Sequence, residues 1–266
     1  MAKALAVTII IIAIGSAIPI ITHQWDLQPD ISKHGVLIDR QFDETMWEAG
    51  LSFLAAQFVL AAFIWKYSNR SAEARIGKFP GGAGGLVAAA FLLVGTEVLA
   101  LGVFGTKAWA QQYLVPPSSD AMPIEVQAQQ FAFYFRYPGP DGKFGATRPQ
   151  LISAGTENFF GLDPNDPAGR DDIVTAEMAV PVNREVRLWL HSIDMDHAFF
   201  VQGLRVHQDV VPGLDLYIHF TAVKPGKYEI VCTQLCGLGH YNMKAYLYVF
   251  NQQDFDAWLK KEAALQ

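Results

Sequence analysis

The sequence contains only two cysteines in 266 residues, and it has few charged residues. Charged side chains make up 17% of the chain, against about 25% in ordinary soluble domains, whereas 51% of the residues are hydrophobic. This balance excludes a disordered chain and argues against a purely water-soluble protein. There is no basic excess either: the formal net charge is −6, which argues against a nucleic-acid-binding protein. A Cys-x-x-Cys-His motif is absent too, so we expect no covalently attached c-type haem.

The charge is distributed unevenly along the chain. Residues 1–110 contain eight basic and eight acidic residues, whereas residues 111–266 contain 12 basic and 18 acidic ones. The net charge therefore belongs to the second part. We interpret residues 1–110 as a transmembrane region and the rest as an acidic, water-soluble part.

Three long apolar runs in the first part predict membrane-spanning helices, at about residues 4–22, 46–66 and 86–104. A bilayer core about 30 Å thick needs about 20 apolar residues in a helix, so each run is long enough. The first run could also be a cleaved signal peptide. It is longer than the apolar segment of such a peptide, and no Ala-x-Ala site follows it before His23, so we expect it to be retained. Glu97 lies inside the third run, where a carboxyl group serves either proton transfer or a hydrogen bond to a neighbouring helix.

The basic residues of the short connecting segments predict the orientation in the membrane. Four of them lie between the second and third runs: Lys66, Arg70, Arg75 and Lys78. The segment from His23 to Thr45 instead has more acidic than basic residues. We therefore expect a multi-pass protein of a bacterial inner membrane, with its N-terminus inside and residues 111–266 on the periplasmic side.

The second part begins with a polar, proline-containing linker, predicted at residues 111–122. Beyond it, short alternating or aromatic-rich runs are separated by turn-forming residues. These runs are Ile124–Tyr137, Ile173–Val180, Glu185–His191, Ala198–Leu204, Asp215–Val223, Lys227–Cys232 and Lys244–Phe250. Their number and spacing predict an all-β sandwich or Greek-key barrel over residues 123–250. Residues 251–266 place Phe255, Trp258 and Leu259 on one helical face and predict a C-terminal helix.

Metal-binding side chains are concentrated near the end of the predicted β domain. Cys232, Cys236, His240 and Met243 lie within 12 residues, and His197 is at the edge of an earlier strand. Thiolate, imidazole and thioether groups form a soft ligand set that suits copper, whereas calcium and magnesium prefer oxygen ligands. The set fits two copper ions bridged by both thiolates, with one imidazole on each ion. Met243 and a backbone carbonyl of the loop would then take the weak outer positions.

Three other kinds of site use part of this set. A structural zinc site could use both cysteines and both histidines but would leave Met243 unused. A mononuclear blue-copper site would leave one cysteine unused. The two cysteines could also form a disulfide, as cysteines in an oxidising compartment often do.

The run Cys232-x-x-x-Cys236-Gly237-x-x-His240-x-x-Met243 resembles the copper motif of subunit II of haem-copper cytochrome c oxidases. Two upstream motifs support the resemblance: Asp194-x-x-His197 and Gln208-Asp209-Val210-Val211-Pro212-Gly213. The resemblance covers the two later apolar runs, the linker, the β domain and the closing helix. The first run is an addition to the two spans usual in that family.

The resemblance implies a cupredoxin-like fold that holds a dinuclear copper centre, called CuA. The implied ligands are the side chains of His197, Cys232, Cys236, His240 and Met243, with the main-chain carbonyl of Gln234. Members of the family accept electrons from cytochrome c and pass them to haem in subunit I, where oxygen is reduced to water. The expected partners are therefore subunit I, other oxidase subunits and a c-type cytochrome, either soluble or membrane-bound.

Two positions depart from the family pattern. Gln234 stands where many members have a glutamate that helps to bind magnesium at the contact with subunit I, which puts a magnesium ion in doubt here. Phe131 stands where the family has the tryptophan through which electrons enter.

Asp194 and Asp196 lie beside His197 and are candidates for docking a basic cytochrome c.

Two further functions are weighed against an oxidase subunit. A membrane-anchored copper-binding or assembly protein would bind one copper ion reversibly and would not need both histidines and Met243. The related subunit II of a quinol oxidase is expected to lack the copper ligands, all of which are present here.

Overall fold

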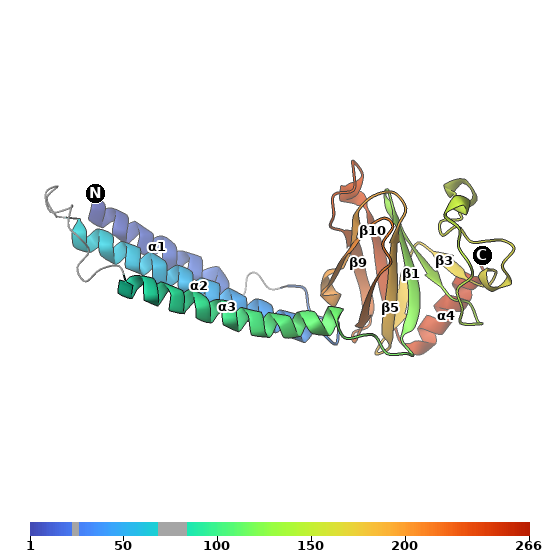
Figure 1. The fold of residues 1–266 in the computed structure, drawn as a ribbon, viewed down its shortest axis with the longest axis horizontal. Helices are drawn as coiled ribbons and strands as arrows, with labels where there is room; N and C mark the ends of the chain where they lie inside the picture. The colour runs from blue at the N-terminus through green and yellow to red at the C-terminus, as the bar shows by residue number, and fades with distance from the viewer. Residues whose placement is uncertain (23–26, 69–83) are drawn as a thin grey trace. The chain divides into compact units, whose positions relative to one another are not determined.

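The computed structural model describes residues 1–22, 27–68 and 84–266 (Figure 1). The chain divides into two compact units, one containing most of the three long helices and the other comprising Leu27–Val36 and Trp109–Gln266. Arg70, Arg75 and Lys78, on which the predicted orientation partly rests, lie outside the described residues.

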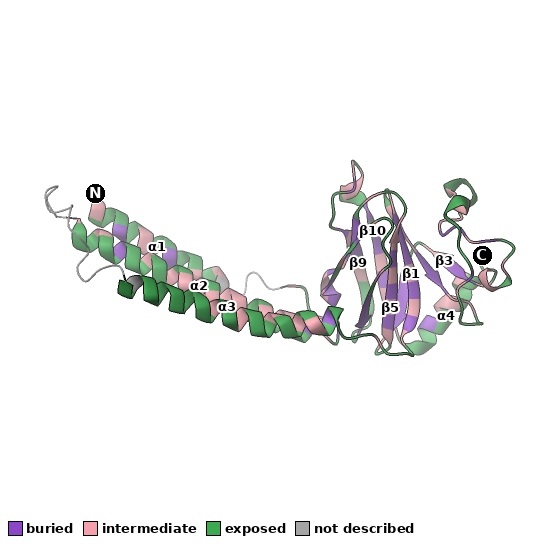
Figure 2. Cartoon of the chain, in the orientation of Figure 1, coloured by how far each residue is buried: buried purple, intermediate pink, exposed green. Residues whose placement is uncertain are grey.

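The first unit is built from three long apolar helices, α1 (Ala2–Ile21), α2 (Gly35–Tyr67) and α3 (Gly84–Tyr113). Each contains a stretch long and apolar enough to cross a membrane, and most of their residues are exposed (Figure 2). Apolar surface of this extent is stable in lipid rather than in water, so the protein is membrane-anchored. Helix α2 begins well before the predicted span because the charged segment also suits a helix: Arg40 Nε and Glu44 Oε1, one turn apart, are 2.8 Å apart.

The second unit is a sandwich of two five-stranded β-sheets. One sheet has the strand order β3-β2-β1-β5-β8 and the other β4-β10-β9-β6-β7. The strands are β1 (Met122–Gln129), β2 (Ala132–Tyr137), β3 (Ile173–Thr175), β4 (Met178–Pro181), β5 (Glu185–Ser192), β6 (His197–Val201), β7 (Val206–Val210), β8 (Leu216–Thr221), β9 (Gly226–Cys232) and β10 (Lys244–Phe250). Helix α4 (Gln252–Ala263) follows the last strand.

This architecture confirms the fold class predicted from the sequence, apolar helices followed by a cupredoxin-like β domain. Two of the predicted runs each contain two strands rather than one. Ile124–Tyr137 contains the antiparallel pair β1 and β2, and Ile173–Val180 contains β3 and β4, which lie in different sheets. Hydrophobic alternation indicates which residues are extended but not where the chain turns back. The β1–β2 turn at Gln130 and Phe131 has no glycine or proline to mark it.

The core lies between the two sheets, where alternate side chains of each strand point inward (Figure 2). Tyr137 of β2 joins one sheet to the other. Its buried hydroxyl donates a hydrogen bond to the carbonyl of Ala179 in β4 (2.9 Å) and accepts one from the amide of the same residue (2.8 Å). The buried hydroxyl thus has both a hydrogen-bond donor and an acceptor. Because these two bonds join β2 to β4, they link one sheet to the other.

The segment Leu27–Val36, which follows α1 and includes the first two residues of α2, packs into the β domain. Ile31 is only 2% exposed and belongs to the core. Its amide donates to the carbonyl of Gly203 (2.8 Å) and its carbonyl accepts from the amide of Val223 (2.7 Å). Lys33 adds a bond from its amide to the carbonyl of Thr221 (2.9 Å). The β domain therefore includes a segment that lies before most of α2 and all of α3 in the sequence.

We expect Ile31→Ala to destabilise the β domain by about 2 to 5 kcal/mol, because the substitution leaves a cavity in a packed core. Val36→Ala is the matched control, since Val36 belongs to the same segment but is 65% exposed, and it should change stability by less than about 0.5 kcal/mol. Chemical denaturation of the full chain in detergent, followed by tryptophan fluorescence, measures both. Equal effects of the two substitutions would show that Ile31 does not contribute to the core.

A buried ion pair holds the long connection between β2 and β3 against the first sheet. Arg136 of β2 is 1% exposed, and its Nε lies 3.1 Å from Oδ2 of the buried Asp172. Its Nη1 lies 2.8 Å from Glu125 Oε2, and its guanidinium stacks over the ring of Phe144 at 4.9 Å. The amide of Gly145 also donates to Asp172 (2.9 Å). One buried cation and one buried anion thus organise a connection that has little secondary structure of its own.

Candidate metal centre

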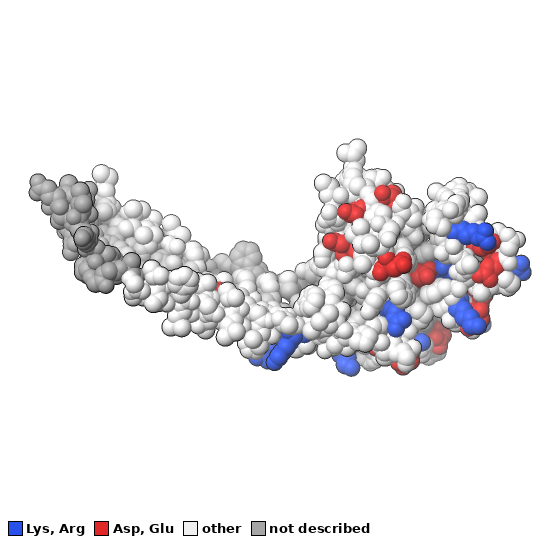
Figure 3. Space-filling view, viewed as in Figure 1, with Lys and Arg blue, Asp and Glu red and all other residues white. Residues whose placement is uncertain are grey.

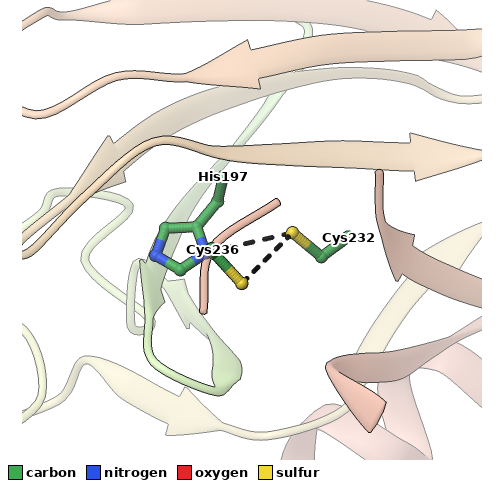
Figure 4. A group of neighbouring side chains, drawn as sticks. All are labelled: His197, Cys232 and Cys236. Carbon is green, nitrogen blue, oxygen red and sulfur yellow. Dashed lines mark hydrogen bonds between the residues drawn. The ribbon is translucent and has the colours of Figure 1, made fainter. Parts of the chain in front are cut away.

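The candidate ligands come together because two strands of the same sheet pair antiparallel. His197 is the first residue of β6 and Cys232 the last residue of β9, and the β6–β9 register pairs Phe199 with Cys232. The chain then forms a loop that carries Cys236 and leads into β10 (Lys244–Phe250). Figure 4 shows the side chains of His197, Cys232 and Cys236 turned toward one another.

The two sulfur atoms are at the centre of the group. The Cys232 and Cys236 Sγ atoms lie 3.9 Å apart. Each sulfur has an imidazole beside it: His197 Nδ1 is 3.9 Å from Cys232 Sγ, and His240 Nδ1 is 3.6 Å from Cys236 Sγ. The Met243 Sδ is 3.7 Å from Cys236 Sγ. On the other side, the Gln234 carbonyl lies 3.2 Å from Cys232 Sγ, so all six predicted ligands are brought together.

These distances fit a metal site and do not fit a disulfide. The S–S bond of a disulfide is about 2.05 Å, and both cysteines are free here. Two sulfurs that bind one metal ion at about 2.3 Å with a tetrahedral angle lie about 3.8 Å apart, close to the 3.9 Å seen between Cys232 and Cys236. The residues therefore fit a metal that is held by both thiolates.

Four of the six predicted ligands are buried, whereas His240 is partly exposed and Gln234 is exposed. Cys236 and His197 are fully buried, Met243 is 2% exposed and Cys232 is 7% exposed. The ends of the loop are held by the hydrogen bond from the Cys232 amide to the Met243 carbonyl (3.1 Å). A ligand set packed in this way keeps its geometry and excludes water.

His197 is oriented by a carboxylate. Its Nε2 lies 2.8 Å from Asp194 Oδ1, which leaves Nδ1 to face Cys232. Metal-binding histidines commonly donate their second ring N–H to such an acceptor, which fixes the tautomer and the ring plane. Asp194 therefore orients His197, while Asp196 is exposed. The docking of a partner at these two residues stays a prediction.

The two thiols differ in acidity. Burial raises the pKa of Cys232, but hydrogen bonds with His197 and with backbone groups outweigh this effect and lower the pKa to about 6. Burial and the charge of Cys232 raise the pKa of Cys236 to about 11. One thiolate is thus present at neutral pH before any metal binds, and thiolate is the form that binds metals.

We expect the metal-free chain to ionise its thiols in two steps, the first near pH 6, because ionisation of Cys232 opposes that of Cys236. A titration followed by the ultraviolet absorbance of the thiolate measures this. In Cys232→Ser the first step should disappear. A single step for both thiols near their ordinary pKa, about 8.5, would contradict the asymmetry.

Gln130 is a residue near the centre that the sequence analysis missed. Its Nε2 lies 2.6 Å from the Cys236 carbonyl, although the two residues are 106 positions apart. The only signal in the sequence is that Gln130 directly precedes Phe131, which was itself predicted to lie near the site. Phe131 is 40% exposed and its ring contacts the loop at Gly237 and Gly239.

Comparison with known proteins gives consistent matches. A family model described as cytochrome c oxidase subunit II, periplasmic domain, matches residues 166–249. The chain is 31% identical over 261 residues to the alternative cytochrome c oxidase subunit 2 of Bradyrhizobium diazoefficiens, covering 97% of this chain and 92% of that protein. It is 26% identical over 264 residues to cytochrome c oxidase subunit 2 of Thermostichus vulcanus, covering 91% and 80%. Among solved structures, the periplasmic domain of subunit II of cytochrome oxidase (CoxB) of Bradyrhizobium japonicum matches with 26% identity and a TM-score of 0.42, covering 57% of this chain and 99% of that chain.

Proposed function

Because this chain belongs to the family of cytochrome c oxidase subunit II, we propose that its β domain holds the dinuclear copper centre CuA. The chain is a subunit of a haem-copper oxidase. The proposed ligands are His197, Cys232, the carbonyl of Gln234, Cys236, His240 and Met243.

The distribution of donor atoms around the two sulfurs is the observation that carries the proposal. In the part of the chain that the structure describes, only one group of His, Cys and acidic residues brings at least three ligand atoms within 4.8 Å of one another, and it consists of His197, Cys232 and Cys236. His240 lies beside Cys236, outside that tight group. A single tetrahedral ion needs four ligands that converge on one point at about 2.0 to 2.3 Å. One imidazole beside each sulfur is the arrangement that two ions sharing both thiolates require.

When bound, the copper pair would accept and release one electron at a time. The residues of the chain hold it in place: the antiparallel pairing of β6 with β9 in one sheet fixes His197 and Cys232, and the burial of Cys236 and Met243 excludes water. When the positions of the ligands change little between the two oxidation states of the metal, electron transfer needs little reorganisation energy. The fold thus suits electron transfer rather than catalysis on a bound substrate.

The proposed path begins at a c-type cytochrome and ends at haem in subunit I, where oxygen is reduced to water. Phe131, which contacts the ligand loop and is partly exposed, is the proposed point of entry. On the face shown in Figure 3, the charged side chains scattered over the part of the β domain that contains β9 and β10 are acidic, among mostly uncharged residues. Together with Asp194 and Asp196, this surface is suited to attract a basic cytochrome.

The proposed sidedness places the β domain in the periplasm, anchored to a bacterial inner membrane by α1, α2 and α3. The loop charges support this orientation. The proposal includes no magnesium ion, because Gln234 offers a neutral amide where a carboxylate would be the stronger magnesium ligand.

Neither alternative function is favoured by an observation. A carrier that releases its copper needs few ligands, whereas here two imidazoles and the Met243 sulfur all lie beside the thiols. A quinol oxidase subunit would not keep these ligands.

The proposal is tested on the purified oxidase complex that contains this chain. We expect it to consume oxygen with a reduced c-type cytochrome as donor, at a rate that falls as ionic strength rises, because opposite charges guide the encounter. Quinol should support no oxygen uptake when cytochrome is absent. Oxygen uptake with quinol alone, and none with any c-type cytochrome, would overturn the proposal.

A further inference from the structure

We propose that Gln130 is a positioning residue of the metal centre, which ties the ligand loop to the carboxylate that orients His197. This assignment rests on the function proposed above. It concerns a residue that donates no atom to the metal but contacts both sides of the ligand set.

The first contact of Gln130 is made by its side chain. The Nε2 group donates to the Cys236 carbonyl at 2.6 Å and to the Met195 Sδ at 2.8 Å. An amide nitrogen carries two hydrogens, so it serves both acceptors at once. The Cys236 backbone is thus held at the residue that carries one of the two proposed bridging sulfurs.

The second contact is made by the backbone of the same residue. The Gln130 amide donates to Asp194 Oδ2 at 2.6 Å, and the other oxygen of that carboxylate lies 2.8 Å from His197 Nε2. Asp194 therefore bridges Gln130 and a proposed ligand. A single residue is thus linked to His197 through Asp194 and directly to the backbone of Cys236.

The ligand loop lies close to the β1–β2 turn at two of its glycines. A Cβ on Gly237 would come within 2.8 Å of Gln130 Nε2, and a Cβ on Gly239 within 2.5 Å of the Phe131 ring. Gly237 also has a φ of +127°, which other residues rarely adopt. The close approach that brings Gln130 to Cys236 is thus built into the loop sequence as well as into the turn.

These contacts predict what Gln130 contributes. Gln130 is exposed, so its hydrogen bonds compete with water and its loss is not expected to unfold the domain. The expected effect lies in the geometry of the ligands instead. Residues that orient metal ligands typically change metal affinity or activity by about 10- to 100-fold when they are replaced.

The test compares Gln130→Glu with Gln129→Glu in the full chain purified in detergent. Gln130→Glu keeps the shape of the side chain but removes the N–H donors, whereas Gln129→Glu places the same charge one residue away. We expect Gln130→Glu to shift the visible absorption and the electron paramagnetic resonance spectrum, and to weaken copper binding at least about tenfold in a chelator competition. Gln129→Glu should match the parent, and Gln130→Asn, which keeps a shorter amide, should lie between the two.

Spectra and affinity that are the same in Gln130→Glu as in the parent would overturn the assignment, as would equal changes in both glutamate variants. Hydrogen exchange of residues 233–243 in the metal-free chain provides a readout independent of copper. It should be faster in Gln130→Glu than in Gln129→Glu, and equal rates would also overturn the assignment. A parent chain that binds no copper would instead overturn the proposed function, so the two failures are distinguishable.

Discussion

Cys232→Ser is expected to abolish copper binding by the chain and, with it, cytochrome oxidation by the assembled complex. The Cys232 and Cys236 sulfurs lie 3.9 Å apart, each beside one imidazole, so each thiolate is placed to contact both proposed ions. A serine hydroxyl is a harder donor than a thiolate and stays protonated at neutral pH, so it does not replace a bridging sulfur. The loss of activity should exceed the about 100-fold seen when only an outer partner of a metal ligand is changed.

Leu235→Ser is the matched control for this substitution. Leu235 lies between the two cysteines but is 73% exposed, so the control introduces a serine into the same loop without removing a ligand. Metal analysis of both purified variants should find copper at the parent level in Leu235→Ser and almost none in Cys232→Ser. Parental copper content and spectrum in Cys232→Ser would contradict the bridging role.

Asp172→Ala is expected to destabilise the β domain strongly. It leaves the guanidinium of Arg136 buried without its main partner, and removing one member of a buried ion pair costs about 3 to 5 kcal/mol. Glu125 still contacts Arg136 Nη1 at 2.8 Å, so we expect the lower end of this range. Chemical denaturation of the full chain measures the free energy of unfolding.

The double variant Arg136→Met/Asp172→Leu separates the burial of a lone charge from the loss of the pair. Replacing both partners with apolar residues of similar size is often close to neutral, so the double variant should be more stable than Asp172→Ala. Adding the two single effects would then overestimate the loss, because the sites interact. A double variant that is less stable than either single one would show that the pair itself stabilises the connection.

The ligand set could be predicted from the sequence because it is largely local. Cys232 ends one strand, and Cys236, His240 and Met243 follow it within 11 residues, so the sequence itself places these donor groups close together. His197 is 35 residues from Cys232 but stands in a motif of its own. The apolar helices and the β class follow equally well from the lengths and periods of hydrophobic runs.

Contacts between distant segments could not be predicted in this way. Ile31 reads as part of a loop between two apolar runs, yet it packs against Gly203 in the β domain. Arg136 and Asp172 are separated by 36 residues and read as ordinary charged residues of a strand and a loop. Gln130 carries no charge, and no metal-binding motif includes it. Periodicity reports which residues are buried but not which of them meet.

Copper analysis combined with electron paramagnetic resonance of the purified full chain tests the central claim most directly. The account predicts two copper ions per chain and, in the oxidised form, one unpaired electron shared between both copper nuclei. Its signal should vanish in Cys232→Ser and persist in Leu235→Ser. One copper ion, zinc or no metal in the parent chain, or a signal confined to a single copper nucleus, would contradict the account.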